Sequence, residues 1–343
     1  MLTENLSFGK LRTLPRVPIA HLPTPLEEMP RLSKALGGPR LFVKRDDQTG
    51  LATGGNKARK LEFLVAEAME KGADTIITAG AVQSNHARQT VAAAVKFGLR
   101  CCLVLSGQSP NRWNGNLLLD ELLGADIRWA GERDREQMME EVAEEMTRLG
   151  RRPYIVPIGG SNPVGSAGYV AAMEELMGQL AERDLQVDRV VFPTGSGGTQ
   201  DGLIVGAKAL GFAGRIEGIS VSATQDVLRP RLEELAAETT AFLRLDLSFA
   251  SEDFIVHDDY LGEGYAKMGP PEREAIRLSA RTEGLLVDPV YTGRTMAGLI
   301  DLIRRGIFGK EETVLFWHTG GIPALFAYAD ELVVGGWMSD VGG

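Results

Sequence analysis

The segment Thr53-Gly54-Gly55-Asn56-Lys57-Ala58-Arg59-Lys60 joins a glycine-rich turn to the start of a helical pattern. Apolar residues then recur at the spacing of one buried helix face, at Leu61, Leu64, Val65 and Ala68. We expect Asn56 to cap this helix and Lys57 to point from its first turn into a cavity. Positive potential from the helix start, Arg59 and Lys60 would disfavour protonation of Lys57, which makes its amine a better nucleophile toward an aldehyde. The alternative is a solvated lysine in a polar first turn.

The composition is typical of a globular protein that binds small molecules. With 343 residues and 44% apolar content, the chain is long enough for a large core and suggests about two domains. Its net charge of -9 argues against binding to nucleic acid or to an anionic membrane, because either partner needs a basic face. We find neither a signal-peptide pattern nor an apolar run long enough to span a bilayer, so we expect a cytoplasmic protein.

The cysteines and histidines show no pattern of a disulfide or metal site. Cys101 and Cys102 are adjacent in an apolar run, so on a strand they would face opposite sides of a sheet. The histidines lack the short spacing of zinc ligands; they are His21, His86, His257 and His318. We therefore expect no disulfide framework and no bound metal.

Strand-like and helix-like segments alternate along most of the chain, which is typical of a parallel sheet covered by helices. Apolar runs rich in β-branched residues predict strands at 41–44, 75–78, 101–105, 190–193, 216–221 and 313–317. Helical periodicity predicts helices at 85–97, 165–182 and 202–210. No long linker separates two blocks, so we expect the chain to cross between its domains more than once.

The loop after the strand predicted at 190–193 reads Thr194-Gly195-Ser196-Gly197-Gly198-Thr199 and leads directly into a helix. Parallel sheets bind ligands beyond the carboxyl ends of their strands. Glycines let backbone amides converge on an anion and the three hydroxyls add donors, so this loop is suited to one phosphate. The spacing matches neither GxGxxG nor GxxxxGK[ST], which argues against a dinucleotide or a nucleoside triphosphate. A tight turn without a ligand is the alternative.

A second loop, Gly80-Ala81-Val82-Gln83-Ser84-Asn85-His86-Ala87-Arg88, also leads from a predicted strand into a helix. Ser84 is at the N-cap position of that helix. Exposed amides, the Ser84 hydroxyl and the Asn85 amide would suit the carboxylate of an amino acid, and Asn85 could instead reach a phenolic oxygen. The alternative is that Ser84 only caps the helix.

Two further loops follow apolar runs, and they read Asp288-Pro289-Val290-Tyr291-Thr292-Gly293 and His318-Thr319-Gly320-Gly321. Taken alone, Tyr291 is explained as a packed aromatic residue and Thr319 as a turn residue. Together with Lys57, the four loops supply a phosphate site, a carboxylate site and a hydroxyl for a ring nitrogen. These are the parts needed to hold pyridoxal phosphate and an amino acid.

The chain resembles, nearly end to end, the fold type II pyridoxal-phosphate enzymes, in the branch that holds D-cysteine desulfhydrase, 1-aminocyclopropane-1-carboxylate deaminase and L-cysteate sulfo-lyase. The resemblance is carried by segments 22–26 (LPTPL), 44–47 (KRDD), 54–57 (GGNK), 83–86 (QSNH), 159–162 (GGSN), 194–199 (TGSGGT), 288–293 (DPVYTG) and 318–321 (HTGG). It implies an α/β fold like the tryptophan synthase β-subunit, with two open, twisted, mostly parallel sheets flanked by helices. We predict a large cofactor-binding domain of residues 1–50 and 163–343, and a small domain of residues 51–162.

The resemblance assigns the cofactor contacts residue by residue. It implies that Lys57 holds pyridoxal phosphate as an imine and moves the proton at the substrate's α-carbon. Asn85 would contact the cofactor's phenolic oxygen and Thr319 its pyridine nitrogen. The phosphate would be held by residues of the glycine-rich loop: Thr194, Gly195, Ser196, Gly197, Gly198 and Thr199.

The resemblance also implies where the substrate binds. The substrate carboxylate would be held at the second loop, by Ser84, Asn85 and His86. Tyr291 and Tyr265 would line the reacting side of the cofactor ring, and Thr292 is a further substrate-binding candidate.

Within this branch the chain looks most like the D-cysteine desulfhydrases, which implies β-elimination of D-cysteine to pyruvate, hydrogen sulfide and ammonia by a homodimer. L-cysteate sulfo-lyase is the first alternative, and its sulfonate would need an arginine, for which Arg112 and Arg294 are candidates. A 1-aminocyclopropane-1-carboxylate deaminase is the next, although the deaminases carry an acidic residue where this chain has Thr292. A non-enzymatic amino-acid sensor that contains pyridoxal phosphate, and a metabolic enzyme without this cofactor, are the remaining alternatives.

Overall fold

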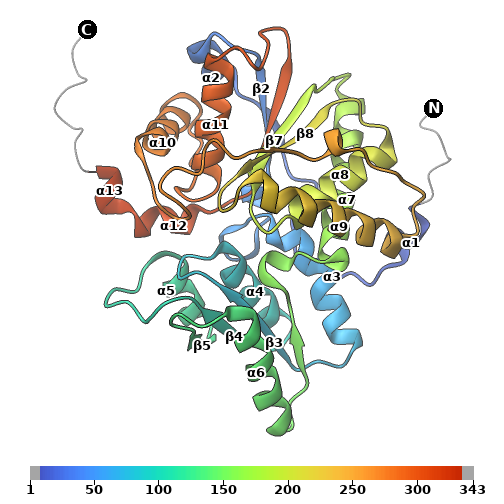
Figure 1. The fold of residues 1–343 in the computed structure, drawn as a ribbon, viewed down its shortest axis with the longest axis vertical. Coiled ribbons are helices and arrows are strands. Elements are labelled where there is room, and N and C mark those ends of the chain that lie inside the picture. Colours follow the sequence, from blue (N-terminus) through green and yellow to red (C-terminus); the bar gives the residue numbers. More distant parts are fainter. Residues whose placement is uncertain (1–7, 334–343) are drawn as a thin grey trace.

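The computed structural model describes residues 8–333, and the ends of the predicted large domain, 1–7 and 334–343, lie outside that range. The strands are β1 (Leu26–Glu28), β2 (Arg40–Arg45), β3 (Thr75–Gly80), β4 (Arg100–Leu105), β5 (Asp126–Trp129), β6 (Pro153–Ile155), β7 (Arg189–Thr194), β8 (Arg215–Ser220), β9 (Ile255–His257) and β10 (Thr313–His318). They form a six-stranded sheet in the order β1-β2-β10-β7-β8-β9 and a four-stranded sheet in the order β5-β4-β3-β6. Figure 1 shows the larger sheet in the upper half of the molecule and the smaller one below it.

Within the described residues, every pair of neighbouring strands is parallel except the edge pair β1–β2. Successive residues of β10 alternate between the two apolar clusters on the faces of the larger sheet: Val314 packs in one and Leu315 in the other. Both faces are therefore buried, as parallel sheets require. The predicted α/β fold with two mostly parallel sheets flanked by helices is confirmed.

The helices cover both sheets (Figure 1). They are α1 (Gly9–Thr13), α2 (Pro30–Leu36), α3 (Lys57–Glu70), α4 (Asn85–Lys96), α5 (Gly115–Leu122), α6 (Arg135–Arg148), α7 (Pro163–Glu182), α8 (Gly198–Leu210), α9 (Gln225–Leu243), α10 (Pro270–Glu283), α11 (Thr292–Arg304), α12 (Ile322–Ala327) and α13 (Ala329–Val333). The three predicted helices are present as α4, α7 and α8, and the six predicted strands are present within a few residues of their expected ends.

The differences from the sequence prediction lie in short or shifted elements. Helix α8 begins at Gly198, four residues before the predicted start at 202, because glycines at its first turn mask the helical pattern. Strands β1, β5, β6 and β9 span three or four residues, too few for a period of two to be recognised. Strands of the smaller sheet all lie within residues 75–155, whereas the larger sheet takes strands from both sides of that range. The exact domain boundaries stay a prediction.

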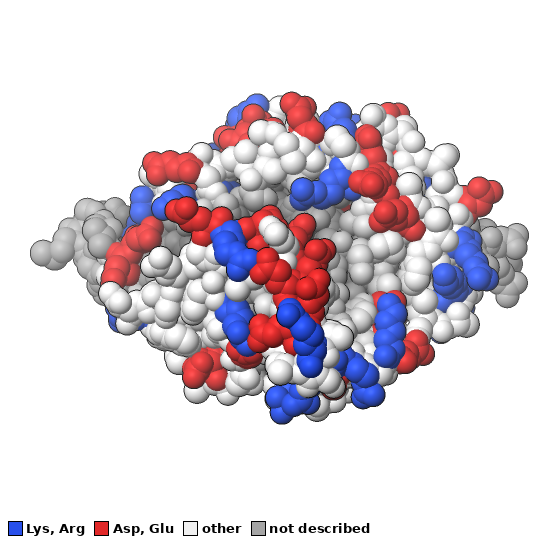
Figure 2. Space-filling view, turned by 60° about the horizontal axis from the view of Figure 1, so that its bottom comes forward, with Lys and Arg blue, Asp and Glu red and all other residues white. Residues whose placement is uncertain are grey.

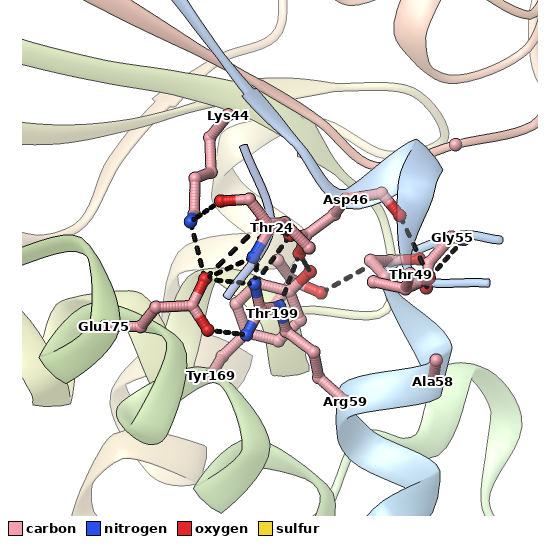
Figure 3. A network of polar contacts seen from close by, with 12 residues as sticks. Thr24, Lys44, Asp46, Thr49, Gly55, Ala58, Arg59, Tyr169, Glu175 and Thr199 are labelled. Carbon is pink, nitrogen blue, oxygen red and sulfur yellow. Dashed lines mark hydrogen bonds and ion pairs between the residues drawn. The ribbon is translucent and has the colours of Figure 1, made fainter. Parts of the chain in front are cut away.

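A buried polar network joins α3 to the larger sheet and to α7 (Figure 3). The Arg59 guanidinium donates two hydrogen bonds of 2.8 Å to the Asp46 carboxylate and also reaches Glu175 at 2.9 and 3.0 Å. Lys44 of β2 donates to Glu175, and Tyr169 of α7 donates to Asp46. Burial acts to raise the pKa of Asp46, but Arg59 overrides this effect and holds the pKa below its usual value. The first turn of α3 is therefore fixed against two other elements.

No helix within residues 8–333 is long and apolar enough to cross a membrane.

Figure 2 shows the face that lies at the bottom of Figure 1, where acidic side chains gather near the middle and basic side chains are placed around them. Helix α6 carries several of the chain's glutamates, among them Glu141 and Glu145, which pair with Arg133 and Arg128. This face carries charges of both signs.

Replacing Arg59 with methionine is expected to lower the free energy of unfolding by about 3–5 kcal/mol, because it leaves the buried Asp46 and Glu175 carboxylates without their guanidinium partner. Urea denaturation followed by circular dichroism measures the loss. The matched control is Arg12→Ala, which breaks the Arg12–Glu174 pair; the Arg12 side chain is 73% exposed, so the loss should stay under about 1 kcal/mol. Equal losses in the two variants would contradict the importance of the buried network.

Candidate active site

A cavity of about 380 Å³ lies at the carboxyl ends of strands from both sheets. Strand β3 of the smaller sheet and strands β7, β8 and β10 of the larger sheet end at its wall. Ligand pockets for small molecules commonly have volumes in the range of about 300–1,000 Å³. Among the described residues that line this cavity, Lys57 and Arg135 are basic, and none is an aspartate or a glutamate. The cavity is therefore suited to anionic ligands.

The start of α3 forms one wall of the cavity, and Asn56 is at its N-cap position as predicted, but the Asn56 side chain makes no capping hydrogen bond. Asn56 already has helical backbone angles, and its Nδ2 donates to Thr199 Oγ1 over 3.0 Å. Gln89 of α4 takes the capping role, because its Oε1 accepts the Ala58 amide at 3.0 Å. Gly55 permits this approach: its φ is +127°, and a Cβ would come within 2.6 Å of Gln89 Nε2.

Lys57 is the first residue of α3 and lines the cavity. Burial lowers the pKa of Lys57 to about 8. The direction of the shift is as predicted, but its cause is burial and not the charges of Arg59 and Lys60. The pKa of Lys60 is itself lowered well below the usual lysine value, first by burial and then by the charge of Lys57. Lys60 Nζ donates to the carbonyl of Gly159 over 3.1 Å.

A chain of side chains fixes which way the Asn85 amide faces. Arg88 can only donate, and its Nε donates to Asn116 Oδ1 over 3.1 Å. Asn116 therefore presents its Nδ2, which donates to Asn85 Oδ1 over 2.8 Å. The Asn85 oxygen is thus occupied, and the Nδ2 of Asn85 is the group left to donate to a ligand. Arg88 also holds the glycine-rich turn before α3, since it donates to the carbonyls of Ala52 and Gly54.

Helix α4 directs its N-terminus at the cavity. Ser84 Oγ accepts the Ala87 amide at 3.1 Å, which confirms Ser84 as the N-cap. No hydrogen bond within residues 8–333 uses the amides of Asn85 and His86, and both residues line the cavity. These amides, and the Ser84 proton, are donors for an anion at the positive end of the helix.

The His86 ring faces the smaller sheet. Thr78 Oγ1 donates to the carbonyl of Val156 over 2.8 Å, so it accepts the proton of His86 Nε2 at 2.8 Å. The ring is neutral, because burial, followed by the charges of Lys57 and Lys60, lowers the pKa of His86 well below its usual value. His86 therefore offers a ligand its backbone amide and no charged side chain.

The glycine-rich loop between β7 and α8 forms a second site for an anion. No hydrogen bond within the part of the chain that the structure describes uses the amides of Gly195, Ser196 and Gly197. Ser161 braces the loop from outside, since its Oγ accepts the Gly198 amide at 3.1 Å and donates to Ser196 Oγ over 2.8 Å. The unpaired amides lie just before the first turn of α8, where the helix dipole favours a negative charge.

Two tyrosines close another side of the cavity. The hydroxyls of Tyr265 and Tyr291 are 2.7 Å apart, and the rings meet edge to face. Asp288 holds Tyr291 in place, because its carboxylate accepts the amides of Val290, Tyr291 and Thr292 at 2.8–3.1 Å. Burial raises the pKa of Tyr291 well above its usual value, so the hydroxyl carries its proton at neutral pH.

Thr319 lines the cavity and its carbonyl accepts the Asn56 amide at 3.0 Å. Thr292, in contrast, does not line the cavity. Its Oγ1 donates to Asp288 Oδ1 and accepts the Asp288 amide, both over 2.8 Å, so its hydroxyl stabilises the turn that carries Tyr291. Thr292 is therefore not placed to contact a substrate directly.

The structure brings most of the predicted site residues to one cavity: Lys57, Ser84, Asn85, His86, Thr194, Gly195, Ser196, Gly197, Thr199, Tyr265, Tyr291 and Thr319. Gly198 and Thr292 are not among the residues that line it. Neither candidate arginine is there: Arg112 lines a different hollow, and Arg294 is buried in an ion pair with Glu272.

Sequence reasoning missed residues that act through tertiary contacts. Arg88 and Gln89 follow Asn85 by three and four residues on α4, so helical spacing could have shown that they share its face. Asn116 and Arg135 come from distant segments, and no local pattern marks either of them.

The fold and the cavity define a class of protein. The family described as "Pyridoxal-phosphate dependent enzyme" matches residues 17–320, and the chain belongs to this family. Two D-cysteine desulfhydrases from strains of Klebsiella pneumoniae are 43% identical to it over 333 residues, which cover 95% of this chain and all of each relative.

Solved structures agree with the family. A crystal structure titled as that of an ACC deaminase homologue is 39% identical, with a TM-score of 0.88, and the match covers 96% of this chain and 99% of that one. Maize serine racemase is 19% identical with a TM-score of 0.65, and the match covers 94% of each chain, so it shares the fold. The chain is a pyridoxal-phosphate dependent enzyme.

The residues present fit this cofactor. The amides before α8 are unpaired, and the buried Thr194 Oγ1 beside them has no partner within residues 8–333, as expected where a phosphate binds. Lys57 offers an amine, and the Asn85 Nδ2 offers a donor for a phenolic oxygen. A phosphate, an aldehyde and a phenolate each have a matching group in the same cavity.

Capture of pyridoxal phosphate by the cofactor-free protein should depend on the pKa of Lys57, because only the neutral amine attacks an aldehyde. With a pKa of about 8, roughly a tenth of Lys57 is neutral at pH 7, against about one in 2,500 for an ordinary lysine. The capture rate should rise with pH up to about 8 and level off above it. Absorbance spectroscopy after rapid mixing measures this rate; a rise that continues unchanged toward pH 10 would show an unshifted lysine.

Proposed function

We propose that this enzyme catalyses the β-elimination of D-cysteine to pyruvate, hydrogen sulfide and ammonia. The observation that carries the proposal is Lys57, whose partly neutral amine lines the same cavity as two helix N-termini with unpaired amides. One N-terminus suits the cofactor phosphate and the other the substrate carboxylate. The two relatives that are 43% identical are named D-cysteine desulfhydrase, which supports this substrate.

Bound pyridoxal phosphate supplies an aldehyde for amino groups and a conjugated ring that withdraws electrons from the α-carbon. Within the proposal, the amides at 195–197 would hold the phosphate, and the Asn85 Nδ2 would donate to the phenolic oxygen. Thr319 would offer the ring nitrogen a neutral hydroxyl, which would leave that nitrogen less protonated than a carboxylate would. A good leaving group tolerates this weaker withdrawal of electrons.

Lys57 would hold the cofactor through its amine, and its Nζ, when not bonded to the cofactor, would remove the substrate's α-proton. The Ser84 hydroxyl and the amides of Asn85 and His86 hold the substrate carboxylate, which fixes the α-carbon near Lys57. The carbon–sulfur bond breaks with both electrons on sulfur. Tyr291, which retains its proton, would protonate the departing sulfide together with its hydrogen-bond partner Tyr265. Water then releases ammonia and leaves pyruvate, so the reaction needs no oxidant or reductant.

We also propose that residues 51–162 form a small domain, that residues 1–50 and 163–343 form a large one, and that two chains form a homodimer. Exposed apolar side chains support a contact surface on α5 and α12, which pack against each other: Leu118, Leu122 and Phe326. Light scattering of the purified protein measures the mass; a monomer at micromolar concentration would contradict the dimer.

The variant Lys57→Ala should release neither sulfide nor pyruvate from D-cysteine, and borohydride should trap no cofactor on the chain, because the nucleophile and the base are both removed. Lys71→Ala is the matched control, since Lys71 is the C-cap of α3, at the opposite end from Lys57, and its side chain is 60% exposed and pairs with Glu67. The control should keep full activity. Pyruvate release by Lys57→Ala at the rate of the unchanged enzyme would refute the proposed mechanism.

The same assay separates the rival functions. Purified protein is offered D-cysteine, L-cysteine, L-cysteate, β-chloro-D-alanine and 1-aminocyclopropane-1-carboxylate, and pyruvate and 2-oxobutyrate are measured. We expect D-cysteine to give sulfide over many turnovers, whereas a sensor would change the cofactor absorbance without sustained product. Formation of 2-oxobutyrate from the cyclopropane substrate at the greatest rate would instead identify a deaminase.

A further inference from the structure

Arg135 is a cation in the active-site cavity, and neither the cofactor phosphate nor the substrate carboxylate needs it as a partner. It is the first residue of α6, on the smaller-sheet side of the cavity, and it lines the wall together with Tyr265 and Tyr291. Asp134 fixes the start of this helix, because its Oδ1 accepts the Gln137 amide at 2.8 Å. The Arg135 side chain is partly buried. Its position is thus set by the fold and not by a flexible loop.

The Arg135 guanidinium has no hydrogen bond and no ion pair within residues 8–333. Nearby arginines differ in this respect: Arg133 pairs with Glu141, and Arg128 pairs with Asp126 and Glu145. The cavity offers Arg135 no carboxylate, because none of the described residues that line it is acidic. A partly desolvated guanidinium without a counter-ion is a site for an anion on a ligand.

The other two anions of the proposed reaction already have their own sites. The phosphate has the amides before α8, and the substrate carboxylate has those at the start of α4. Arg135 lies near neither glycine-rich loop in sequence, but its charge acts on the hydroxyls of Tyr265 and Tyr291. Burial raises the pKa of both tyrosines, and the positive charge of Arg135 opposes that rise. Arg135 lines the same cavity as the two tyrosines, which the proposed function puts beside the departing sulfur substituent.

We propose that Arg135 is a specificity-determining residue that binds a negatively charged sulfur group on the β-carbon of the substrate. The group is sulfide as it leaves D-cysteine, or a fully ionised substituent such as a sulfonate. A guanidinium presents several donors in a plane, which matches the oxygens of an oxyanion better than a point charge does. This role takes the place assigned from sequence to Arg112 or Arg294, and it depends on the proposed function, since the β-substituent is defined by that reaction.

The test measures binding to the cofactor-loaded enzyme and does not require turnover. Isothermal titration with D- and L-cysteate, which carry a permanent sulfonate, is compared with D- and L-alanine, which have a neutral β-carbon. The variants are Arg135→Ala, Arg135→Lys and the matched control Arg133→Ala, which removes a paired, exposed arginine two residues away. The unchanged enzyme should bind the cysteate enantiomer of its preferred configuration more tightly than the corresponding alanine.

Arg135→Ala should weaken cysteate binding about tenfold or more and change alanine binding by less than about threefold. The cysteate affinity of Arg135→Lys should lie between that of Arg135→Ala and that of the unchanged enzyme, because lysine keeps the charge and loses the planar donors. Arg133→Ala should match the unchanged enzyme. Equal losses for cysteate and alanine, or no preference for cysteate in the unchanged enzyme, would overturn the role of Arg135. Absence of sulfide from D-cysteine would refute the proposed function separately, because the titration does not use that assay.

Discussion

The bidentate contact of the Arg59 guanidinium with Asp46, shared with Glu175, is the constraint on which the site depends. It lies two residues from Lys57 and ties the first turn of α3 to the segment that directly follows strand β2, which begins at Asp46, and to Glu175 of α7. Buried ion pairs are a weak source of net stability, because desolvation of the charges offsets their attraction. Their effect here is geometric: few other arrangements satisfy all these donors and acceptors, so the helix start has one position. The Lys57 amine is thereby placed although it makes no hydrogen bond within residues 8–333.

Around that fixed helix start, the site is built from groups whose partners decide which atom faces the ligand. Arg88 orients Asn116, Asn116 orients Asn85, and a donor faces the cavity as a result. Asp288 and the Thr292 hydroxyl do the same for the turn that carries Tyr291. Such preorganised dipoles need not reorient when a ligand binds, which is how enzyme sites stabilise charge at low cost.

The fold class and the location of the cavity could be predicted from sequence, because long apolar strands and glycine-rich strand-to-helix turns are local signals. Lys57, Ser84 and the loop at 194–199 were found in this way. The side-chain cap expected from Asn56 is missing, because the Asn56 amide donates to Thr199 instead. Gln89, which is distant in sequence, accepts the Ala58 amide in its place. The cause of the Lys57 pKa was also misjudged, since burial is a tertiary property. Arg135 had no local signal, because it enters the cavity from a helix whose other charges are solvated.

The absence of any carboxylate among the described residues of the cavity wall has a consequence for the cofactor-free chain. Burial first, and then repulsion by the charge of Lys57, disfavours protonation of Lys60 and His86. A doubly charged phosphate ester relieves this repulsion, and a ligand that prefers the native state adds stability that grows with the logarithm of its free concentration. Vitamin supply and resistance to unfolding are thus thermodynamically linked in this enzyme, and a chain starved of its coenzyme is also a chain more easily lost to proteolysis.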